Sequence, residues 1–443
     1  MLKRNEVKTE QTWDLTSLFN TEEEYDKALK KYVEEAGAFA SKYKGQLHQS
    51  DVLIEAMKVY RGLLEQIGRL AAYVTLHISA DLNDPENNER RSGFVASVSE
   101  VQTALSFLES EISGVDDETL EEIRRISPEN NHYLLQIQKK KKSRLHEKSE
   151  ETIEALSPVI HATMPLYNKL KLADMDFGSF EVDGKTYPLS FVLFENEYDY
   201  ELDHDVRRKA YVQFSETLSK YKHSMAFNYQ THMTNEKIMA RLRSYDSNMS
   251  YLLDEQDVTR EMDDRQIDVI MKELAPAMRK YAGLLQKRHG LEKMTFNDLK
   301  LVIDPEFEPA VTQEESKKYL VEGLAVLGDE YIEMIERAFK ERWIDFAVNE
   351  GKASGAFCHS PYGAHPFILI SWAAKMREVF VLAHELGHAG HFFRCHQKQN
   401  ITDCRPSMYF IEAPSTFNEL LMANHLLSVS ESKRMQRWIY STK

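Results

Sequence analysis

Residues that break helices are scarce in this chain, and no other feature constrains its fold as strongly. Only 17 glycines and 12 prolines occur among the 443 residues. Glycine and proline disfavour a helix interior most, whereas Leu, Glu, Lys and Ala, which are common here, favour it. The sequence therefore predicts a mainly α fold.

Helices are expected wherever apolar residues recur with the helical period between capping and breaking signals. Thr21 and Glu24 form a capping box, for example, and Gly45 closes the helical segment that follows them. Such patterns cover residues 21–45, 51–80, 86–112, 117–126, 149–171, 204–243, 263–289, 312–326, 329–341 and 374–397, with a last helix that starts near Glu412.

Two segments depart from the helical pattern and predict small β elements. The first, near residues 177–193, contains FGSFEVDGKTYPLSF, in which apolar and polar residues alternate around Asp183-Gly184. That arrangement is typical of a hairpin. The second, residues 343–371, is punctuated by glycine and rich in β-forming residues. It lies directly before the helical pattern at 374–397.

Charge and composition narrow the range of partners. The formal net charge is −15, and an acidic surface repels phosphate backbones, so nucleic acid is not an expected partner. No window approaches the roughly 18 apolar residues of a membrane span, and the first residues lack the apolar stretch of a signal peptide. The three cysteines, in no CxxC pattern, indicate a reducing, cytoplasmic location. The oligomeric state is not predicted.

The pentapeptide HELGH, residues 384–388, predicts a metal site. Positions i and i+4 share one face of a helix, so His384 and His388 can direct ring nitrogens at one point. Zinc accepts such nitrogens, and Glu385 is close enough to take a proton from an attacking water molecule. The apolar helix around the motif strengthens this interpretation, since an unpaired His-Glu-His set is costly to bury there.

A third protein ligand is expected from the helix that starts near Glu412. The pattern HExxHxxGxxH, which supplies a third histidine in one class of zinc protease, is excluded because His391 and Arg394 occupy its last two defined positions. Glu412 and Glu419 are seven residues apart and share a helical face. We expect Glu412 to bind the metal and Glu419 to hydrogen-bond a ligand histidine. His391, on the ligand face, is expected beside the site without binding the ion.

These residues carry a resemblance to a known family. HELGH followed by EAPSTFNE resembles the oligoendopeptidase F branch of the thimet oligopeptidase-like zinc peptidases. The resemblance implies that one zinc ion is bound by His384, His388 and Glu412, with Glu385 as general base. Segments that share the resemblance are WDLTSLF (13–19), LFEN (193–196), RWIDFAVNEGKASGAFC (342–358) and SPYGAHPFILISW (360–372).

The resemblance also implies how peptides are bound. It predicts a two-lobed helical body that encloses a channel for short oligopeptides, with an N-terminal helical lobe at 1–200 and a catalytic domain at 201–443. SGAFC (354–358) matches the strand whose edge pairs with substrate, so a peptide would add to it by β-augmentation. The substrate-binding residues expected there are Gly355, Ala356, Phe357, His359 and His365.

Two alternatives to an endopeptidase remain open at this point. Members of the family continue for more than a hundred residues beyond the last zinc-ligand helix, and that region supplies a His and Tyr residues for the transition state. The sequence ends at Lys443, so a zinc- and peptide-binding fragment with impaired catalysis is one alternative. The other is a related zinc exopeptidase with the same ligands.

Overall fold

A computed structural model describes residues 2–442 and confirms the mainly α architecture with small β elements. The chain packs as two compact units. The first contains residues 2–142 and 308–439, and the second contains residues 143–307 and 440–442. The sequence predicted a functional division between residues 200 and 201. The packing units do not follow that boundary, and the functional division stays a prediction.

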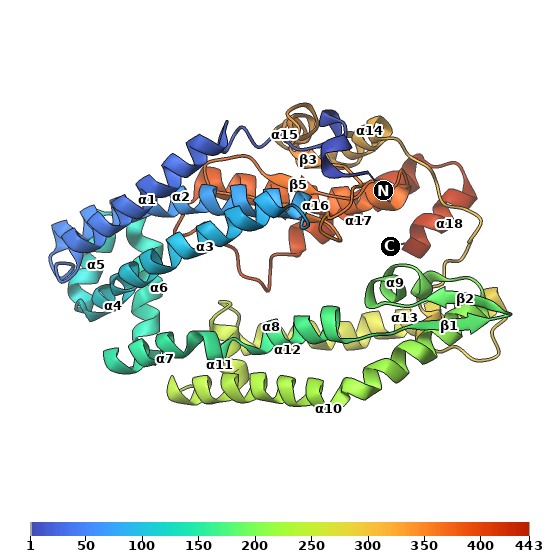
Figure 1. The fold of residues 1–443 in the computed structure, drawn as a ribbon, viewed down its shortest axis with the longest axis horizontal. Coiled ribbons are helices and arrows are strands. Elements are labelled where there is room, and N and C mark those ends of the chain that lie inside the picture. The colour runs from blue at the N-terminus through green and yellow to red at the C-terminus, as the bar shows by residue number, and fades with distance from the viewer. Residues whose placement is uncertain (1, 443) are drawn as a thin grey trace. The chain divides into compact units, whose positions relative to one another are not determined.

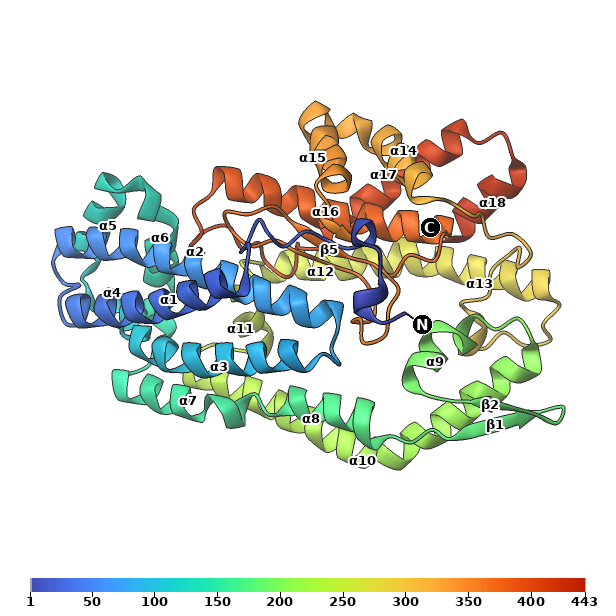
Figure 2. The same ribbon diagram turned by 45° about the horizontal axis from the view of Figure 1, so that its top comes forward.

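The first unit begins with a layer of long helices. Helices α1, α2 and α3 contact one another along their lengths (Figures 1 and 2). Their core is rich in aromatic residues, among them Tyr25, Tyr32 and Phe39, all at most 2% exposed. The helices of this part are α1 (Glu22–Tyr43), α2 (Ser50–Ala80), α3 (Pro85–Leu105), α4 (Phe107–Gly114), α5 (Asp117–Ile126) and α6 (Asn131–Lys140).

A small three-stranded sheet follows in the same unit, within the segment predicted to be β-rich. Its strand order is β3-β5-β4, with β3 (Ile344–Asp345) parallel and β4 (Phe357–His359) antiparallel to the central β5 (Phe367–Leu369). Lys352, 3% exposed, donates to Asp345 at 2.7 Å and to the carbonyl of Ile370 at 2.8 Å. These contacts hold the loop between β3 and β4. Because β5 is the central strand, β4 is an edge strand of the sheet.

The remaining helices of the first unit surround α16. Helix α16 (Met376–Lys398) packs against α17 (Ala413–Val429) (Figure 1) and also against β4. The other helices here are α14 (Gln313–Leu324), α15 (Asp329–Lys340) and α18 (Lys433–Thr442), of which α14 and α15 also contact α16 (Figure 2).

The second unit is built along α10 (His204–Leu242), a helix of 39 residues. The predicted hairpin is present as β1 (Ser179–Val182) and β2 (Lys185–Pro188), and β1 packs on α10. Phe177, Phe194 and Phe214 form the centre of the core between them. The other helices are α7 (Glu147–Ile160), α8 (Thr163–Lys169), α9 (Phe191–Asn196), α11 (Asn248–Asp254), α12 (Arg260–Val269) and α13 (Ala275–His289).

Two predicted helices are interrupted: the pattern at 86–112 divides into α3 and α4 at Ser106, and the pattern at 149–171 divides into α7 and α8. The pattern at 149–171 predicts a single helix, yet α7 ends at Ile160 and α8 begins at Thr163. Pro165 lies in the first turn of α8, where its missing N–H breaks no helical hydrogen bond. A continuous helix would lose a hydrogen bond at Pro165 in addition to the one already lost at Pro158 inside α7, and the turn avoids that second loss.

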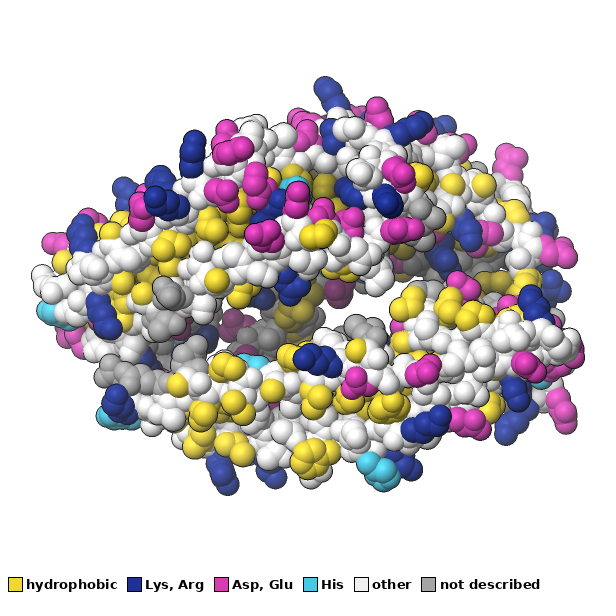
Figure 3. Space-filling model, viewed as in Figure 1, with side chains coloured by type: hydrophobic (Ala, Val, Ile, Leu, Met, Phe, Trp, Pro, Cys, Tyr) yellow, Lys and Arg dark blue, Asp and Glu magenta, His cyan; other side chains and the backbone are white. Residues whose placement is uncertain are grey.

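The surface carries charged side chains of both signs (Figure 3). Acidic and basic side chains are interspersed over the face shown in Figure 3. Among the described residues, no helix is both long enough and apolar enough to cross a bilayer.

Candidate metal centre

Helix α16 carries both predicted histidines and holds them on a rigid element. Its first turn is capped by Glu378, whose carboxylate accepts the backbone N–H of Lys375 at 2.7 Å. The apolar residues of the helix, including Val379, Leu382 and Leu386, are fully buried in the first unit. The helix is therefore fixed by packing on one face, while the histidine face points toward α17.

The predicted ligand atoms converge. Nε2 of His384 lies 3.1 Å from Oε2 of Glu412, and Nε2 of His388 lies 3.2 Å from the same oxygen. Among residues 2–442, this is the group of His, Cys, Asp and Glu side chains placed to hold a metal ion, with its ligand atoms within 4.8 Å of one another. The structure thus brings together three side chains that the sequence separates by up to 28 positions.

Glu419 fixes the orientation of the His384 ring. Its Oε1 lies 2.6 Å from Nδ1 of His384. A carboxylate at that distance binds a proton on Nδ1, so the neutral ring presents the lone pair of Nε2 to Glu412. The sequence predicted this role for Glu419, and the geometry is consistent with it.

Glu412 is positioned by its own helix end. It lies at the N-cap of α17, where the helix dipole favours a negative charge. The hydroxyl of Ser415, a fully buried residue, lies 3.0 Å from Oε2 of Glu412 and 2.9 Å from its carbonyl oxygen. The carboxylate is otherwise exposed, with 63% of its side chain accessible, so one oxygen is held while the other is open.

The glycine of HELGH permits this arrangement. A Cβ atom at Gly387 would lie 2.5 Å from Cα of Ser415 and 2.9 Å from the carbonyl oxygen of Pro414. Both neighbours are backbone atoms, which cannot move aside as a flexible side chain can. Helices α16 and α17 therefore cross in backbone contact at this point, and Glu412 reaches the histidines.

Glu385 is buried beside the cluster and has a free oxygen. The residue is 6% exposed, and its Oε2 has no hydrogen-bond partner among the described atoms. Burial raises the pKa of Glu385 to about 7; the charge of His384 opposes this shift and that of Glu412 adds to it. A carboxyl with such a pKa is a stronger base than an ordinary glutamate.

The predicted substrate residues lie in two different environments. Phe357 and His359 belong to the edge strand β4, which packs on α16, and Gly355 and Ala356 precede it. His365 is not at the cluster: its ring stacks on Trp343 at 4.7 Å, and its two nitrogens contact Ser17 and the carbonyl of Pro366. The geometry leaves β4 as the candidate substrate strand and gives His365 contacts with Trp343, Ser17 and Pro366; substrate binding by all these residues stays a prediction.

His391 also lies outside the group of possible ligands. Its Nδ1 is buried without a hydrogen-bond partner among the described atoms, and its ring meets Phe410 edge-on at 6.0 Å. Burial lowers its pKa. It is a neighbour of His388 outside the ligand group, and the expectation that it does not bind the ion stays a prediction.

Comparison with known proteins decides the family. Residues 198–442, more than half of the chain and all of the candidate site, match the model of peptidase family M3. The chain belongs to peptidase family M3. It is 29% identical to the oligopeptidase PepF of Bacillus subtilis over 98% of this chain. It is 24% identical to an oligoendopeptidase F homologue of Borreliella burgdorferi over 100% of this chain.

The M3 chain is shorter than these relatives. It spans 65% of the length of the Bacillus protein and 75% of that of the Borreliella protein. Solved structures share the fold. One from Chlamydophila abortus aligns with 99% of this chain and 74% of its own (TM-score 0.82, 21% identity). Oligoendopeptidase F from Enterococcus faecium aligns with 94% of this chain and 70% of its own (TM-score 0.65, 20% identity).

Two residues near the candidate centre of this M3 member escaped the sequence analysis. Tyr331 and Asn418, both buried, hydrogen-bond to each other and to backbone carbonyls of α16. One signal was available for Asn418, which is a polar residue at a position of α17 that the helical pattern assigns to the core. Tyr331 comes from α15 and gave no such signal.

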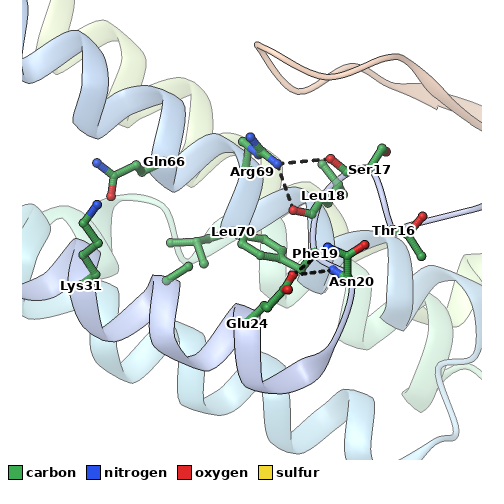
Figure 4. Close-up of a pocket in the computed structure, with 11 residues that line it drawn as sticks. Thr16, Ser17, Leu18, Phe19, Asn20, Glu24, Lys31, Gln66, Arg69 and Leu70 are labelled. Carbon is green, nitrogen blue, oxygen red and sulfur yellow. Dashed lines mark hydrogen bonds between the residues drawn. The ribbon is translucent and has the colours of Figure 1, made fainter.

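A cavity elsewhere in the first unit lacks the residues of the candidate metal centre. It encloses about 510 Å³ between α1, α2 and residues 16–20 (Figure 4). Arg69 donates to the carbonyls of Ser17 and Leu18, and Glu24 accepts from the side chain of Asn20 (Figure 4). These groups hold the segment against the two helices, so their polar atoms are engaged in structure.

Proposed function

We propose that this chain is a zinc metalloendopeptidase that hydrolyses internal peptide bonds of short oligopeptides. One observation carries the proposal: Nε2 of His384, Nε2 of His388 and Oε2 of Glu412 converge, with the free carboxylate oxygen of Glu385 beside them. Membership of family M3 and the names of its oligopeptidase relatives support the choice of substrate class.

The donor set fits a zinc ion. The lone pair of His384 Nε2 faces a carboxylate oxygen at 3.1 Å, and two such acceptors repel unless a cation or proton lies between them. Ligands about 2.0–2.1 Å from a tetrahedral zinc stand roughly 3.3 Å from one another, close to the separations found here. Two imidazoles and one carboxylate are also the set typical of a catalytic zinc site with an open position.

Zinc bound by these residues would act as a Lewis acid on the scissile carbonyl and lower the pKa of water. Glu385 would accept the proton from the attacking water, because its Oε2 is buried and has no hydrogen-bond partner among the described atoms. It would then pass that proton to the leaving amine. Glu419 would hold the His384 ring in the tautomer that leaves Nε2 free.

The edge strand β4 would position the peptide. The sheet order leaves one side of β4 without a strand partner among the described residues, and β4 packs on the helix that carries Glu385. A peptide added there would be bound through its backbone, which allows many sequences. Phe357, His359 and the preceding Gly355 and Ala356 would line it within the channel that the family resemblance predicts.

The proposed location is a reducing compartment, the cytoplasm. The three cysteines are free, and Cys395 and Cys404 contact backbone carbonyls rather than each other's sulfur. Nucleic acid and membranes are not proposed as partners.

The decisive experiment measures cleavage of an internally quenched peptide of about ten residues, long enough to lie along a strand. We expect cleavage with zinc and none with a chelator. Glu385→Gln should abolish turnover while zinc stays bound stoichiometrically, because the substitution removes the base and keeps all three ligands. Products identified by mass spectrometry should show internal cuts.

Three outcomes would contradict the proposal in different ways. Full turnover in Glu385→Gln would remove the proposed base. Trimming from one end would indicate an exopeptidase. Stoichiometric zinc and peptide binding without turnover in the unsubstituted chain would indicate a binding module with impaired catalysis.

A further inference from the structure

Two helices supply the proposed ligands, and their relative register must be fixed within tenths of an ångström to hold an ion. Backbone contact at Gly387 and Ser415 sets how closely α16 and α17 approach. This contact does not fix the translation or rotation of one helix relative to the other, because glycine has no side chain to pack into a groove of the facing helix. Some other contact must set this register.

A buried hydrogen-bond network joins α16 and α17 next to His384. The amide of Asn418 donates from Nδ2 to the backbone carbonyl of Ala383 at 2.9 Å. Ala383 directly precedes His384, and Asn418 directly precedes Glu419, which binds His384. Asn418 and Glu419, neighbours on α17, therefore bond to Ala383 and His384, neighbours on α16. These two hydrogen bonds fix the register of the two helices.

Tyr331 extends the network to a third helix. Its hydroxyl, on α15, donates to the carbonyl of Leu386 at 2.8 Å and accepts the second Nδ2 hydrogen of Asn418 at 2.8 Å. The ring fits against Gly390, where a Cβ atom would lie 2.2 Å from the ring carbon Cε2. Gly390 thus leaves room for the Tyr331 ring against α16, whereas Gly387 lets the backbone of α17 approach.

We infer that Tyr331 and Asn418 are positioning residues for the metal centre, which act by fixing the register of the Glu412 helix on the histidine helix. This inference rests on the proposed function and deepens it. Tyr331 is 9% exposed and Asn418 2%, so water does not replace a lost bond readily. The carbonyls of Ala383 and Leu386 use their second lone pairs here, beyond the helical bonds they already accept. Neither residue touches the ligand atoms.

The test measures the zinc dissociation constant by competition with a chromophoric chelator, together with thermal unfolding. Tyr331→Phe removes only the hydroxyl and keeps the ring against Gly390. Asn418→Leu keeps the volume and removes the donors. Each should weaken zinc binding about tenfold, the lower range for residues that orient metal ligands. Cleavage should recover substantially at saturating zinc in Tyr331→Phe.

A double variant tests whether the two residues act as one unit. Tyr331→Phe with Asn418→Leu should weaken zinc binding no more than the stronger single change does, because groups in one network are not additive. Multiplicative losses would overturn the single-network claim. Because the Phe variant is so conservative, it should fold even if the double variant does not.

Asn228→Leu is the matched control. Asn228 is also a buried asparagine, 7% exposed, whose Nδ2 donates to a backbone carbonyl, that of Thr163 at 2.9 Å. Its loss should lower the unfolding temperature and leave the zinc dissociation constant unchanged. Wild-type zinc affinity in Tyr331→Phe and Asn418→Leu, whatever their stability, would overturn the inference. Failure of the unsubstituted chain to bind zinc would instead overturn the proposed function.

Discussion

Gly387 and Ser415 place the backbones of two helices in direct contact, with only 2.5 Å between a Cβ built on the glycine and Cα of the serine. The glycine lies between the two histidines of HELGH, and the serine lies three residues after Glu412. The contact therefore sits at the centre of the candidate site. It explains why a residue that disfavours helices stands in the middle of α16.

We predict that Gly387→Ala weakens zinc binding and destabilises the fold. The added methyl meets backbone on α17, so the helices must separate, and overpacking of this kind costs about 1–3 kcal/mol. Separation also moves Glu412 away from His384 and His388. Zinc competition and urea unfolding would measure both effects.

Gly37→Ala is the control for that change. Gly37 lies inside α1, and a Cβ there has nothing within 4 Å. Alanine is favoured over glycine in a helix by about 1 kcal/mol, so this variant should be more stable and bind zinc normally. Normal zinc affinity and raised stability in Gly387→Ala as well would show that the helices do not meet as described.

Two substitutions at Glu419 should distinguish the effect of its charge on zinc affinity from the effect of its hydrogen bond to His384. Glu419→Ala removes the acceptor that lies 2.6 Å from His384 Nδ1. We expect zinc affinity to fall about 10–100-fold, the usual loss when a partner of a ligand histidine is removed. Glu419→Gln keeps an acceptor oxygen and should lose less. Equal zinc affinity in the wild type and both variants would contradict the orienting role.

Local signals explain what the sequence could predict. Thr21 caps α1 and Asp203 caps α10 through bonds that span only two or three residues, and such bonds leave a readable pattern. HELGH also carries its geometry locally, because helical spacing alone aligns His384 and His388. The proposed third ligand was within reach because Glu412 and Glu419 share a helical face.

Contacts between distant segments explain what the sequence could not predict. Tyr331 meets Asn418 across 87 positions, and nothing in either local pattern announces the pairing. His365 lies within the β-rich segment at 343–371, and nothing in that pattern predicts that its ring stacks on Trp343. Which side of a loop a histidine faces depends on packing, and packing is not encoded within a few residues.

The second unit depends on a buried ion pair that offers a prediction about stability. Asp298 is fully buried and binds Arg207, 1% exposed, at 2.8 Å and Arg208 at 2.9 Å. Hydrogen bonds from Thr295 and Arg207 lower its pKa in spite of the opposing effect of burial. Asp298→Asn would leave a buried guanidinium without its charge partner, which costs about 3–5 kcal/mol.

Hydrogen exchange of α10 amides would measure that loss, because Arg207 lies in the first turn of α10. Glu55→Gln, at a pair with Lys42 in which both side chains are more than half exposed, is the control and should not change exchange measurably. Unchanged protection of α10 in Asp298→Asn would show that the pair contributes no net stability.

Glu385 should make the metal-free protein less stable as pH rises. Its pKa is raised from 4.5 to about 7, mainly by burial, so between these values the unfolded chain has released a proton that the folded chain keeps. Stability therefore falls with increasing pH across this window, by up to about 3 kcal/mol.

Glu385→Gln cannot titrate and should escape the loss. In chelator, the stability of Glu385→Gln relative to wild type should increase from about pH 4 to about pH 8, as measured by urea unfolding. A difference that stays constant across this range would mean that Glu385 ionises as an ordinary glutamate, and the basicity assigned to it in catalysis would have to come from elsewhere.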